Sequence, residues 1–263
     1  MTQLTGNVLL TGASGGIGQA IARAVARQGA HVILSSRRTE VLEPLAAEIG
    51  GRVLACDLSQ RDQVDRLASE AGDVDILIAN AALPASGVLT ELTPEQIDRM
   101  LEVNLHAPIA LARALAPAMV SRGRGHMVFI SSLAGKAASP ASSIYSATKF
   151  GLRGFALGLR ADLAPHGVGV STVLPGFIRD AGMFADAGVT LPRGVGTRTP
   201  DEVADAVVRA IESDRAEIEV APLPLRMGAS FASLAPGLAG RISRRMGSDQ
   251  IATDLAAGQV SKR

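Results

Sequence analysis

The chain has 263 residues, of which 47% are hydrophobic and only 3% aromatic, and its formal net charge is +1. A chain of this length buries a substantial core, here built mainly from Ala, Val, Leu and Ile. The near-neutral charge argues against bulk electrostatic capture of nucleic acid, so we expect no nucleic-acid partner. The single cysteine, Cys56, excludes an internal disulfide and is typical of a reducing compartment. We therefore expect a cytoplasmic protein with no signal peptide and no apolar stretch long enough to span a bilayer.

Short β-branched runs alternate with longer segments of helical period along the chain. The strand candidates are residues 7–11, 31–35, 52–56, 74–80, 125–131, 168–174 and 216–221. The helix candidates between them are residues 17–28, 40–49, 60–71, 95–121, 144–164 and 200–213. Such alternation predicts βαβ units, and hence an α/β fold with a parallel sheet buried on both faces. No repeat or linker divides the chain, so we predict a single domain over residues 1–263.

Two segments depart from this alternation. Residues 177–198 are rich in glycine and mixed in character, which predicts a long loop next to a substrate. Residues 222–263 form a C-terminal tail, and its part 222–247 has four arginines, no acidic residue and many apolar residues. We interpret this tail as a helix packed on the domain, and leave open a surface for an anionic membrane or a partner.

A glycine-rich turn follows the first strand candidate. The stretch TGASGGIG contains the pattern G-x-x-x-G-x-G between a strand and a helix. Glycine allows the backbone to approach a ligand closely, and the N-terminus of the following helix favours a pyrophosphate. The sequence therefore predicts a dinucleotide site. The residues of the glycine-rich turn that we assign to this site are Gly12, Ser14, Gly15, Gly16, Ile17 and Gly18.

The end of the second strand indicates which dinucleotide is preferred. Ser36 stands where dinucleotide-binding folds usually place an acidic residue, and Arg37 and Arg38 follow it. A carboxylate would repel a 2′-phosphate, whereas a small hydroxyl beside a guanidinium attracts one. We therefore predict NADP, with Arg37 as the main contact and Arg38 either sharing the phosphate or facing solvent. The alternative is a solvated arginine pair at the start of a helix.

A tyrosine and a lysine stand one helical turn apart in the stretch SSIYSATKFGLRG, residues 142–154. Tyr145 is the only tyrosine in the chain, and Lys149 is one of three lysines. A phenol titrates near pH ~10, too high for efficient proton exchange at neutral pH. A neighbouring ammonium favours the phenolate by charge attraction, so this pair suits proton transfer to or from a carbonyl oxygen.

Taken in order, these residues resemble the short-chain dehydrogenase/reductase family. The matching motifs are TGASGGIG, CDL at 56–58, NAA at 80–82, Asn104, SS at 131–132, Tyr145, Lys149 and PG at 175–176. The resemblance covers about residues 1–220. It implies a Rossmann-type, doubly wound, seven-stranded parallel sheet in the order 3-2-1-4-5-6-7. It also implies NAD or NADP as cofactor, hydride transfer between an alcohol and a carbonyl, and no metal.

The resemblance also assigns site residues by position. The catalytic group would be Asn104, Ser132, Tyr145 and Lys149. Ser132 would donate a hydrogen bond to the substrate oxygen, Lys149 would also hold the nicotinamide ribose, and Asn104 would bend its helix and hold a water that links Lys149 to solvent. Further cofactor contacts would come from Asp57, Leu58, Asn80, Ala81, Pro175, Gly176 and Ile178. The chain departs from the family at Ala82, where glycine is usual, and at Asp180, where threonine is usual.

The function that this pattern favours is an NADP-dependent oxidoreductase acting on a small-molecule carbonyl or secondary alcohol. Met183, Phe184, Val189 and Leu191 in the 177–198 loop suggest an apolar ketone or a 3-oxoacyl-type substrate. The alternatives are an NAD-dependent alcohol or hydroxysteroid-type dehydrogenase and a dinucleotide-sensing regulator without activity. We expect a homodimer or homotetramer, formed by the Ala- and Leu-rich helices at 95–121 and 144–164.

Overall fold

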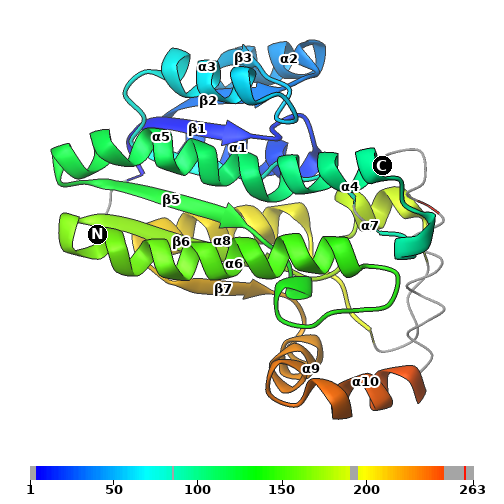
Figure 1. Cartoon of the computed structure of the whole chain (residues 1–263). Coiled ribbons are helices and arrows are strands. Elements are labelled where there is room, and N and C mark those ends of the chain that lie inside the picture. The colour runs from blue at the N-terminus through cyan, green and yellow to red at the C-terminus, as the bar shows by residue number, and fades with distance from the viewer. Residues whose placement is uncertain (1–3, 85, 190–194, 246–257, 259–263) are drawn as a thin grey trace.

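A seven-stranded parallel sheet forms the centre of the molecule, with the strand order β3-β2-β1-β4-β5-β6-β7 (Figure 1). This computed structural model describes residues 4–84, 86–189, 195–245 and 258. The strands are β1 Gly6–Thr11, β2 Ala30–Ser36, β3 Arg52–Ala55, β4 Ile76–Ala79, β5 Gly125–Ile130, β6 Val168–Pro175 and β7 Glu217–Val220. The predicted fold class and strand order are confirmed, and every predicted strand lies within two residues of an observed one.

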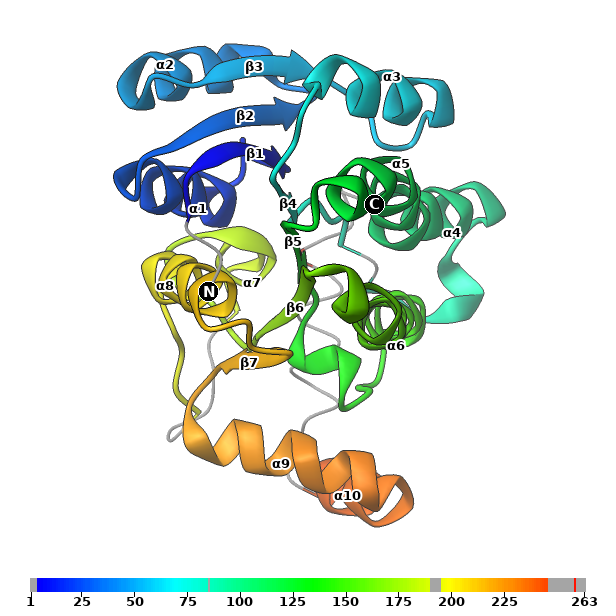
Figure 2. The ribbon, with the colours of Figure 1, turned by 90° about the vertical axis from the view of Figure 1, so that its left-hand side faces the viewer.

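Helices cover both faces of the sheet. Figure 2 shows α1 and α8 on one face and α3, α5 and α6 on the other. The α-helices are α1 Gly16–Arg27, α2 Thr39–Ile49, α3 Arg61–Ala71, α4 Pro94–Leu101, α5 Ala107–Arg122, α6 Ser143–Leu163, α7 Gly182–Ala187, α8 Pro200–Glu212, α9 Leu223–Leu234 and α10 Pro236–Arg245. The shorter turns are η1 Leu89–Glu91, η2 Glu102–His106, η3 Leu133–Gly135 and η4 Ala164–His166.

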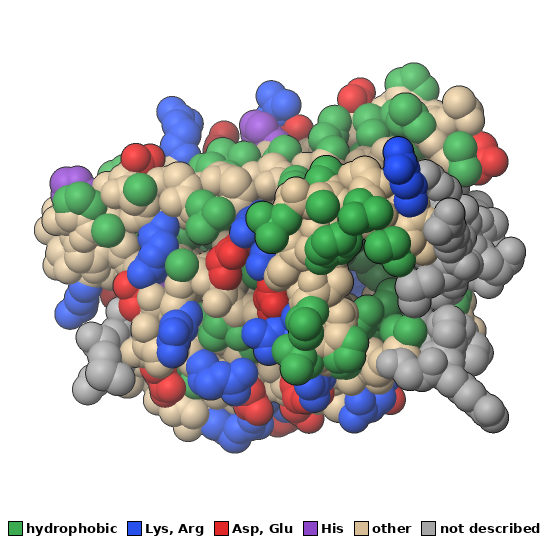
Figure 3. Space-filling model, turned by 90° about the horizontal axis from the view of Figure 1, so that it is seen from below, with side chains coloured by type: hydrophobic (Ala, Val, Ile, Leu, Met, Phe, Trp, Pro, Cys, Tyr) green, Lys and Arg blue, Asp and Glu red, His purple; other side chains and the backbone are tan. Residues whose placement is uncertain are grey.

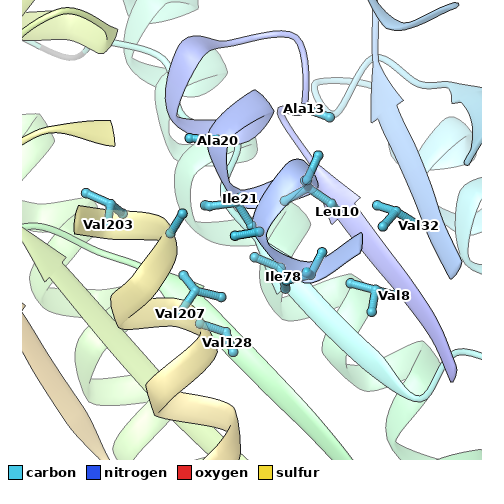
Figure 4. Close-up of a cluster of buried hydrophobic side chains, with 14 of the residues drawn as sticks. Val8, Leu10, Ala13, Ala20, Ile21, Val32, Ile78, Val128, Val203 and Val207 are labelled. Carbon is cyan, nitrogen blue, oxygen red and sulfur yellow. The ribbon is translucent and has the colours of Figure 1, made fainter. Parts of the chain in front are cut away.

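Two apolar clusters, one on each face of the sheet, make up the core. Val8 and Leu10 of β1 point to the face where Ile21 of α1 and Val207 of α8 pack, as Figure 4 shows. Leu9, between them in β1, joins the opposite cluster. Successive side chains of a strand point to opposite faces, so a strand buried on both faces is a nearly continuous apolar run. This packing holds the carboxyl ends of the strands, where the site lies, in fixed positions.

The predicted helix at 95–121 is interrupted. α4 ends at Leu101, a π-helical turn occupies Glu102–His106, and α5 begins at Ala107. π turns of this kind are short insertions that are frequent at functional sites. The whole stretch Pro94–Arg122 is long and apolar enough, by length and composition, to cross a membrane, which corrects our expectation that none would be. It packs against α3 and α6 as part of the helical layer, and 44% of its most apolar window is buried.

The two segments that departed from the alternation also contain helices. The 177–198 loop contains α7, and its residues 190–194 lie outside the described part of the chain. The tail forms two helices, α9 and α10, where we expected one. Pro236 starts the second, because proline lacks the N–H that a continuing helix requires and suits a first helical position. Beyond Arg245 the structure describes only residue 258.

Candidate active site

The predicted site residues gather at one edge of the sheet, where the strands end. Gly12 follows β1, Asn80 follows β4 and Ser132 follows β5, while Pro175 is the last residue of β6. Parallel strands bring their carboxyl ends to the same edge, and ligands of open α/β sheets bind there. The fold therefore assembles residues that are far apart in the sequence.

The glycine loop after β1 is packed too tightly to accept larger residues. Gly12 has a φ of 66°, and a Cβ there would lie 2.6 Å from Cα of Ala81. A Cβ on Gly18 would collide with the carbonyl oxygen of Gly12, and one on Gly16 would collide with Ala181. α1 begins at Gly16, so its first N–H groups point to this edge. The loop thus fits the pyrophosphate of a dinucleotide.

Asn80 fixes this loop from the neighbouring strand. Its Nδ2 donates hydrogen bonds to the carbonyl oxygens of Thr11, at 3.2 Å, and Gly12, at 3.1 Å. The Thr11 hydroxyl accepts hydrogen bonds from the backbone N–H groups of Asn80 and Ala81. Asn80 therefore holds the loop in shape from within the protein.

A serine–serine–arginine cluster lies at the ends of β1 and β2. The hydroxyl groups of Ser14 and Ser36 are 2.7 Å apart, and Arg38 Nη2 donates to Ser14 O and Ser14 Oγ, both at 3.2 Å. The backbone N–H of Arg38 donates to Ser36 Oγ at 3.2 Å. Arg37 is directed elsewhere, with its Nη1 3.9 Å from Asp57 Oδ2. The structure thus brings Arg38, rather than Arg37, into the predicted serine site.

Asp57 carries a negative charge at the end of β3. Burial raises the pKa of its carboxyl, but hydrogen bonds from Ser59 and the charge of Arg37 outweigh burial, so the pKa lies below its usual value. Its Oδ1 accepts from Ser59 N at 3.0 Å and from Ser59 Oγ at 2.8 Å. Asp57 thus holds the turn after β3 and the Arg37 guanidinium together.

Ser132 and Tyr145 form the centre of the site. The Ser132 hydroxyl lies close enough to the Tyr145 phenol to lower its pKa, lies 3.4 Å from the carbonyl oxygen of Pro175, and accepts from Ala134 N at 3.1 Å. α6 presents Tyr145 and Lys149 one turn apart, as the spacing predicted. A hydroxyl, a phenol and an ammonium therefore come together beside the glycine loop.

Burial decides the acid–base properties of this group. Burial raises the pKa of Tyr145, and the nearby Ser132 hydroxyl only partly opposes that rise. Burial lowers the pKa of Lys149 to about 8. The net pKa of Tyr145 is thus raised rather than lowered, and Lys149 Nζ lies 5.7 Å from the ring centroid and donates at 3.0 Å to the carbonyl oxygen of Ile130.

Asn104 lies in the π turn and is fully buried. Its Oδ1 accepts from the backbone N–H of Leu83 at 2.7 Å, and its Nδ2 donates to the carbonyl oxygen of Leu83 at 2.9 Å. Leu105, next to it, packs against Gly151 of α6, where an added Cβ would lie 3.2 Å away. Both polar atoms of Asn104 thus hold the loop after β4, and the π turn contacts the helix that carries Tyr145.

The remaining predicted cofactor residues occupy different positions around the site. The side chains of Leu58 and Ile178 lie in the two core clusters, so they support the edge from beneath. Gly176 donates its backbone N–H to Val220 O at 3.0 Å. Asp180, at the usual threonine position, has a φ of 69° and pairs with Arg179 at 3.5 Å.

The 177–198 loop supplies apolar surface near this edge. The rings of Phe177 and Phe184 have centroids 5.1 Å apart. Met183 and Val189 are partly buried in the same segment. Leu191, which we also expected to contribute to this apolar surface, lies outside the described residues. Among those the structure describes, no group of three or more His, Cys, Asp or Glu side chains could hold a metal ion.

One ionic cluster behind the site escaped the sequence analysis. Glu219 of β7 accepts from Lys136 Nζ, next to η3, and from Arg226 Nε of α9 at 2.9 Å. Its partners are 83 and 7 residues away, so pairing could not be inferred from spacing. The available signal was the alternation of two glutamates, Glu217 and Glu219, with apolar residues in β7, because carboxylates are almost never buried unpaired.

This fold and site define an oxidoreductase of the dinucleotide-binding α/β class. The chain belongs to the short-chain dehydrogenase family, whose family model matches residues 6–190. It is 38% identical to a ketoacyl reductase, HetN, from Nostoc sp., over 90% of this chain and 86% of that protein. It is 35% identical to dehydrogenase/reductase SDR family member 7B from Xenopus laevis, over 88% of this chain and 78% of that protein.

Two solved structures of short-chain dehydrogenases are also similar to this chain. The short-chain dehydrogenase from Sphingobium yanoikuyae in complex with NADPH is 33% identical, with a TM-score of 0.75, over 90% of this chain and 95% of that one. A metagenomic short-chain oxidoreductase in complex with NADP is 36% identical, with a TM-score of 0.69, over 84% of this chain and 99% of that one. The family resemblance inferred from the motifs is thus confirmed.

Proposed function

We propose that this protein is an NADP-dependent reductase that transfers hydride between the nicotinamide and a carbonyl or secondary alcohol. The observation that carries the proposal is that Ser132, Tyr145 and Lys149 lie together at the edge of the sheet that also carries the glycine loop, with Lys149 Nζ 5.7 Å from the Tyr145 ring centroid. The similarity to a ketoacyl reductase and to a dehydrogenase in complex with NADPH supports it.

The residues that fit the cofactor follow the edge of the sheet. The pyrophosphate fits the N-terminus of α1 and the glycine loop, and the 2′-phosphate fits the cluster of Ser14, Ser36 and Arg38. Asp57 and Asn80 shape the adenosine side and the glycine loop. When bound, the nicotinamide would supply hydride in reduction and accept it in oxidation.

The protein's own residues would manage the proton. The raised pKa of Tyr145 keeps its phenol protonated at neutral pH, so it can donate that proton to a carbonyl oxygen. The Ser132 hydroxyl would donate a hydrogen bond to the same oxygen and stabilise the charge that develops there. The ammonium of Lys149 would stabilise the phenolate left behind. Asn104 would act by holding the loop after β4.

The substrate proposed is an apolar ketone or a 3-oxoacyl-type compound. The support is the apolar character of the segment that carries Phe177, Met183 and Phe184, together with the similarity to the ketoacyl reductase from Nostoc. Pockets that bind such substrates are lined mainly by apolar side chains and a few placed polar groups. Ser132 and Tyr145 are the polar groups here.

The test is a screen of aliphatic, aromatic and 3-oxoacyl ketones with NADPH and NADH, following nicotinamide absorbance. We expect turnover of at least one apolar ketone, faster with NADPH. The matched control is Ser132→Ala, which should bind NADPH and lose turnover. Binding of either cofactor without turnover of any ketone or alcohol would instead support a dinucleotide-sensing protein. Faster oxidation of alcohols with NAD would support the NAD-dependent alternative.

A further inference from the structure

Helices α9 and α10 carry an apolar stripe that faces solvent. Leu234 is 87% exposed, Met227 64% and Leu223 62%. The stripe is formed by Leu223, Met227, Phe231, Leu234, Leu238 and Ile242. Within α9, Leu223, Met227, Phe231 and Leu234 recur every three or four positions and so share one side of that helix, and Leu238 and Ile242 share one side of α10. Figure 3 looks at this side of the molecule and shows hydrophobic side chains gathered there, with Lys and Arg as well as Asp and Glu side chains around them.

The opposite side of α9 is fastened to the domain. Arg226 donates to Glu219 of β7, and Lys136 donates to the same carboxylate. The hydroxyl of Ser233 donates to the carbonyl oxygen of Lys136 at 2.8 Å. Ala229 is buried. The helix is therefore held by its polar side, and the exposed stripe is what remains free for a partner.

The charge of this surface is positive. Among the side chains that the structure describes on α9 and α10, Arg226 and Arg241 are basic and none is acidic. Glu219 neutralises only one of its two partners, Lys136 and Arg226, so that cluster keeps a net positive charge. A second copy meeting this surface through a twofold axis would bring arginines against arginines, which is unfavourable. An anionic partner complements the surface.

We propose that the α9–α10 stripe docks the protein on an anionic lipid bilayer. An apolar stripe flanked by arginines is the pattern of helices that lie in the membrane interface, with the apolar side among the acyl chains and the cations at the headgroups. α9 has 12 residues and α10 has 10, so neither spans the hydrocarbon core. The helices therefore lie on the bilayer.

Docking here would bring the active-site edge close to the membrane. α9 starts just after β7, and Gly176 and Val220 are hydrogen-bonded at that edge. Ser132 lies next to Pro175 at the same edge. An apolar substrate dissolved in the bilayer would then reach the site directly. This last step rests on the proposed function, whereas docking itself is independent of any activity.

Vesicle sedimentation with the full chain tests the docking. Vesicles of phosphatidylglycerol and phosphatidylcholine, and of phosphatidylcholine alone, serve as probes at low and high salt. We expect wild type to bind the anionic vesicles and to dissociate in salt. Leu234→Gln with Leu238→Gln should weaken the partition coefficient by about tenfold or more. Arg241→Gln should weaken it by about fivefold, on anionic vesicles only.

Matched substitutions elsewhere control for general effects. Val88→Gln with Leu89→Gln removes two side chains that are 50% and 52% exposed, outside α9 and α10. Arg209→Gln removes an exposed arginine of α8. Both should bind vesicles like wild type, and all variants should keep the wild-type melting temperature. Wild type that stays in the supernatant, or stripe variants that bind like wild type, would overturn the proposal. So would a loss of oligomeric mass in the stripe variants without any vesicle binding.

Discussion

At the scale of single residues, Tyr145 is the group whose removal should separate chemistry from binding. Its hydroxyl lies beside that of Ser132 and, with its raised pKa, would hold the proton that a reduced carbonyl oxygen needs. We expect Tyr145→Phe to lower kcat by about 10²- to 10⁴-fold, the usual contribution of a positioned acid. NADPH binding, measured by fluorescence, should stay within about threefold of wild type, because the ring is kept. Near-normal kcat on a confirmed substrate would show that another group supplies the proton.

Arg38 is the residue we expect to decide cofactor choice. Its guanidinium contacts Ser14, whose hydroxyl meets that of Ser36. A charge-assisted hydrogen bond to a phosphate contributes about 1.5–3 kcal/mol, or roughly 10- to 150-fold in affinity, and exposure favours the low end. Arg38→Ala should weaken NADPH by that factor and leave NADH unchanged, and Arg37→Ala should do less. Ser36→Asp should reverse the preference. Equal Kd values for both cofactors in wild type would refute this assignment.

His126 should make stability depend on pH. Its ring is fully buried, with Nε2 2.8 Å from Ser171 Oγ, and burial lowers its pKa from 6.5 to about 4. The unfolded chain takes up a proton near pH 6.5 and the folded protein does not until about pH 4. Stability is therefore full above pH 6.5 and falls by up to about 3 kcal/mol as the pH drops to 4. Urea unfolding of His126→Gln should show a flatter profile over this range, and a profile parallel to wild type would contradict this origin.

At the scale of elements, the π turn at Glu102–His106 joins the loop after β4 to α6. Asn104→Ala would leave the buried N–H and carbonyl of Leu83 without their partner, which costs about 1–3 kcal/mol per group. We expect a lower urea midpoint and a lower kcat, because the loop adjoins the site. His106→Ala, in the same turn but exposed, is the control and should change stability by less than about 1 kcal/mol. Wild-type stability in Asn104→Ala would contradict this structural role.

The elements also show how much the sequence can predict. The seven strands and their order followed from apolar runs and family motifs, since buried parallel strands leave a clear pattern. The π turn could not be predicted from the sequence, because one extra residue in a helix hardly changes the spacing of apolar residues in a Leu- and Ala-rich segment. The contact of Arg38, rather than Arg37, with Ser14 depended on the turn after β2, where neighbouring side chains diverge. The Lys136–Glu219 pair joins residues 83 positions apart, beyond the reach of any local pattern.

At the scale of the whole molecule, two exposed apolar surfaces differ in charge and should have different partners. Basic side chains, among them Arg226 and Arg241, flank the apolar α9–α10 stripe. The other surface is a groove between α5 and α6 lined by Ile109, Ala112, Arg113, Ala116, Pro117, Val120, Phe155 and Leu159. Phe150 and Leu157 of α6 are also exposed. Only one charged side chain lines this groove, so a second copy can cover it without repulsion between like charges.

We therefore expect a homodimer, or a tetramer that contains it, through α5 and α6. Ala116→Glu would bury a carboxylate in that apolar contact, where Arg113 is the one charged side chain lining the groove, so it should shift wild-type oligomers toward monomer by at least about tenfold in Kd. Ser69→Glu adds the same charge on the exposed side of α3 and should leave the mass unchanged. Light scattering at micromolar concentration measures both. A monomeric wild type would refute the assembly, and an Ala116→Glu variant with wild-type mass would move the interface to another surface.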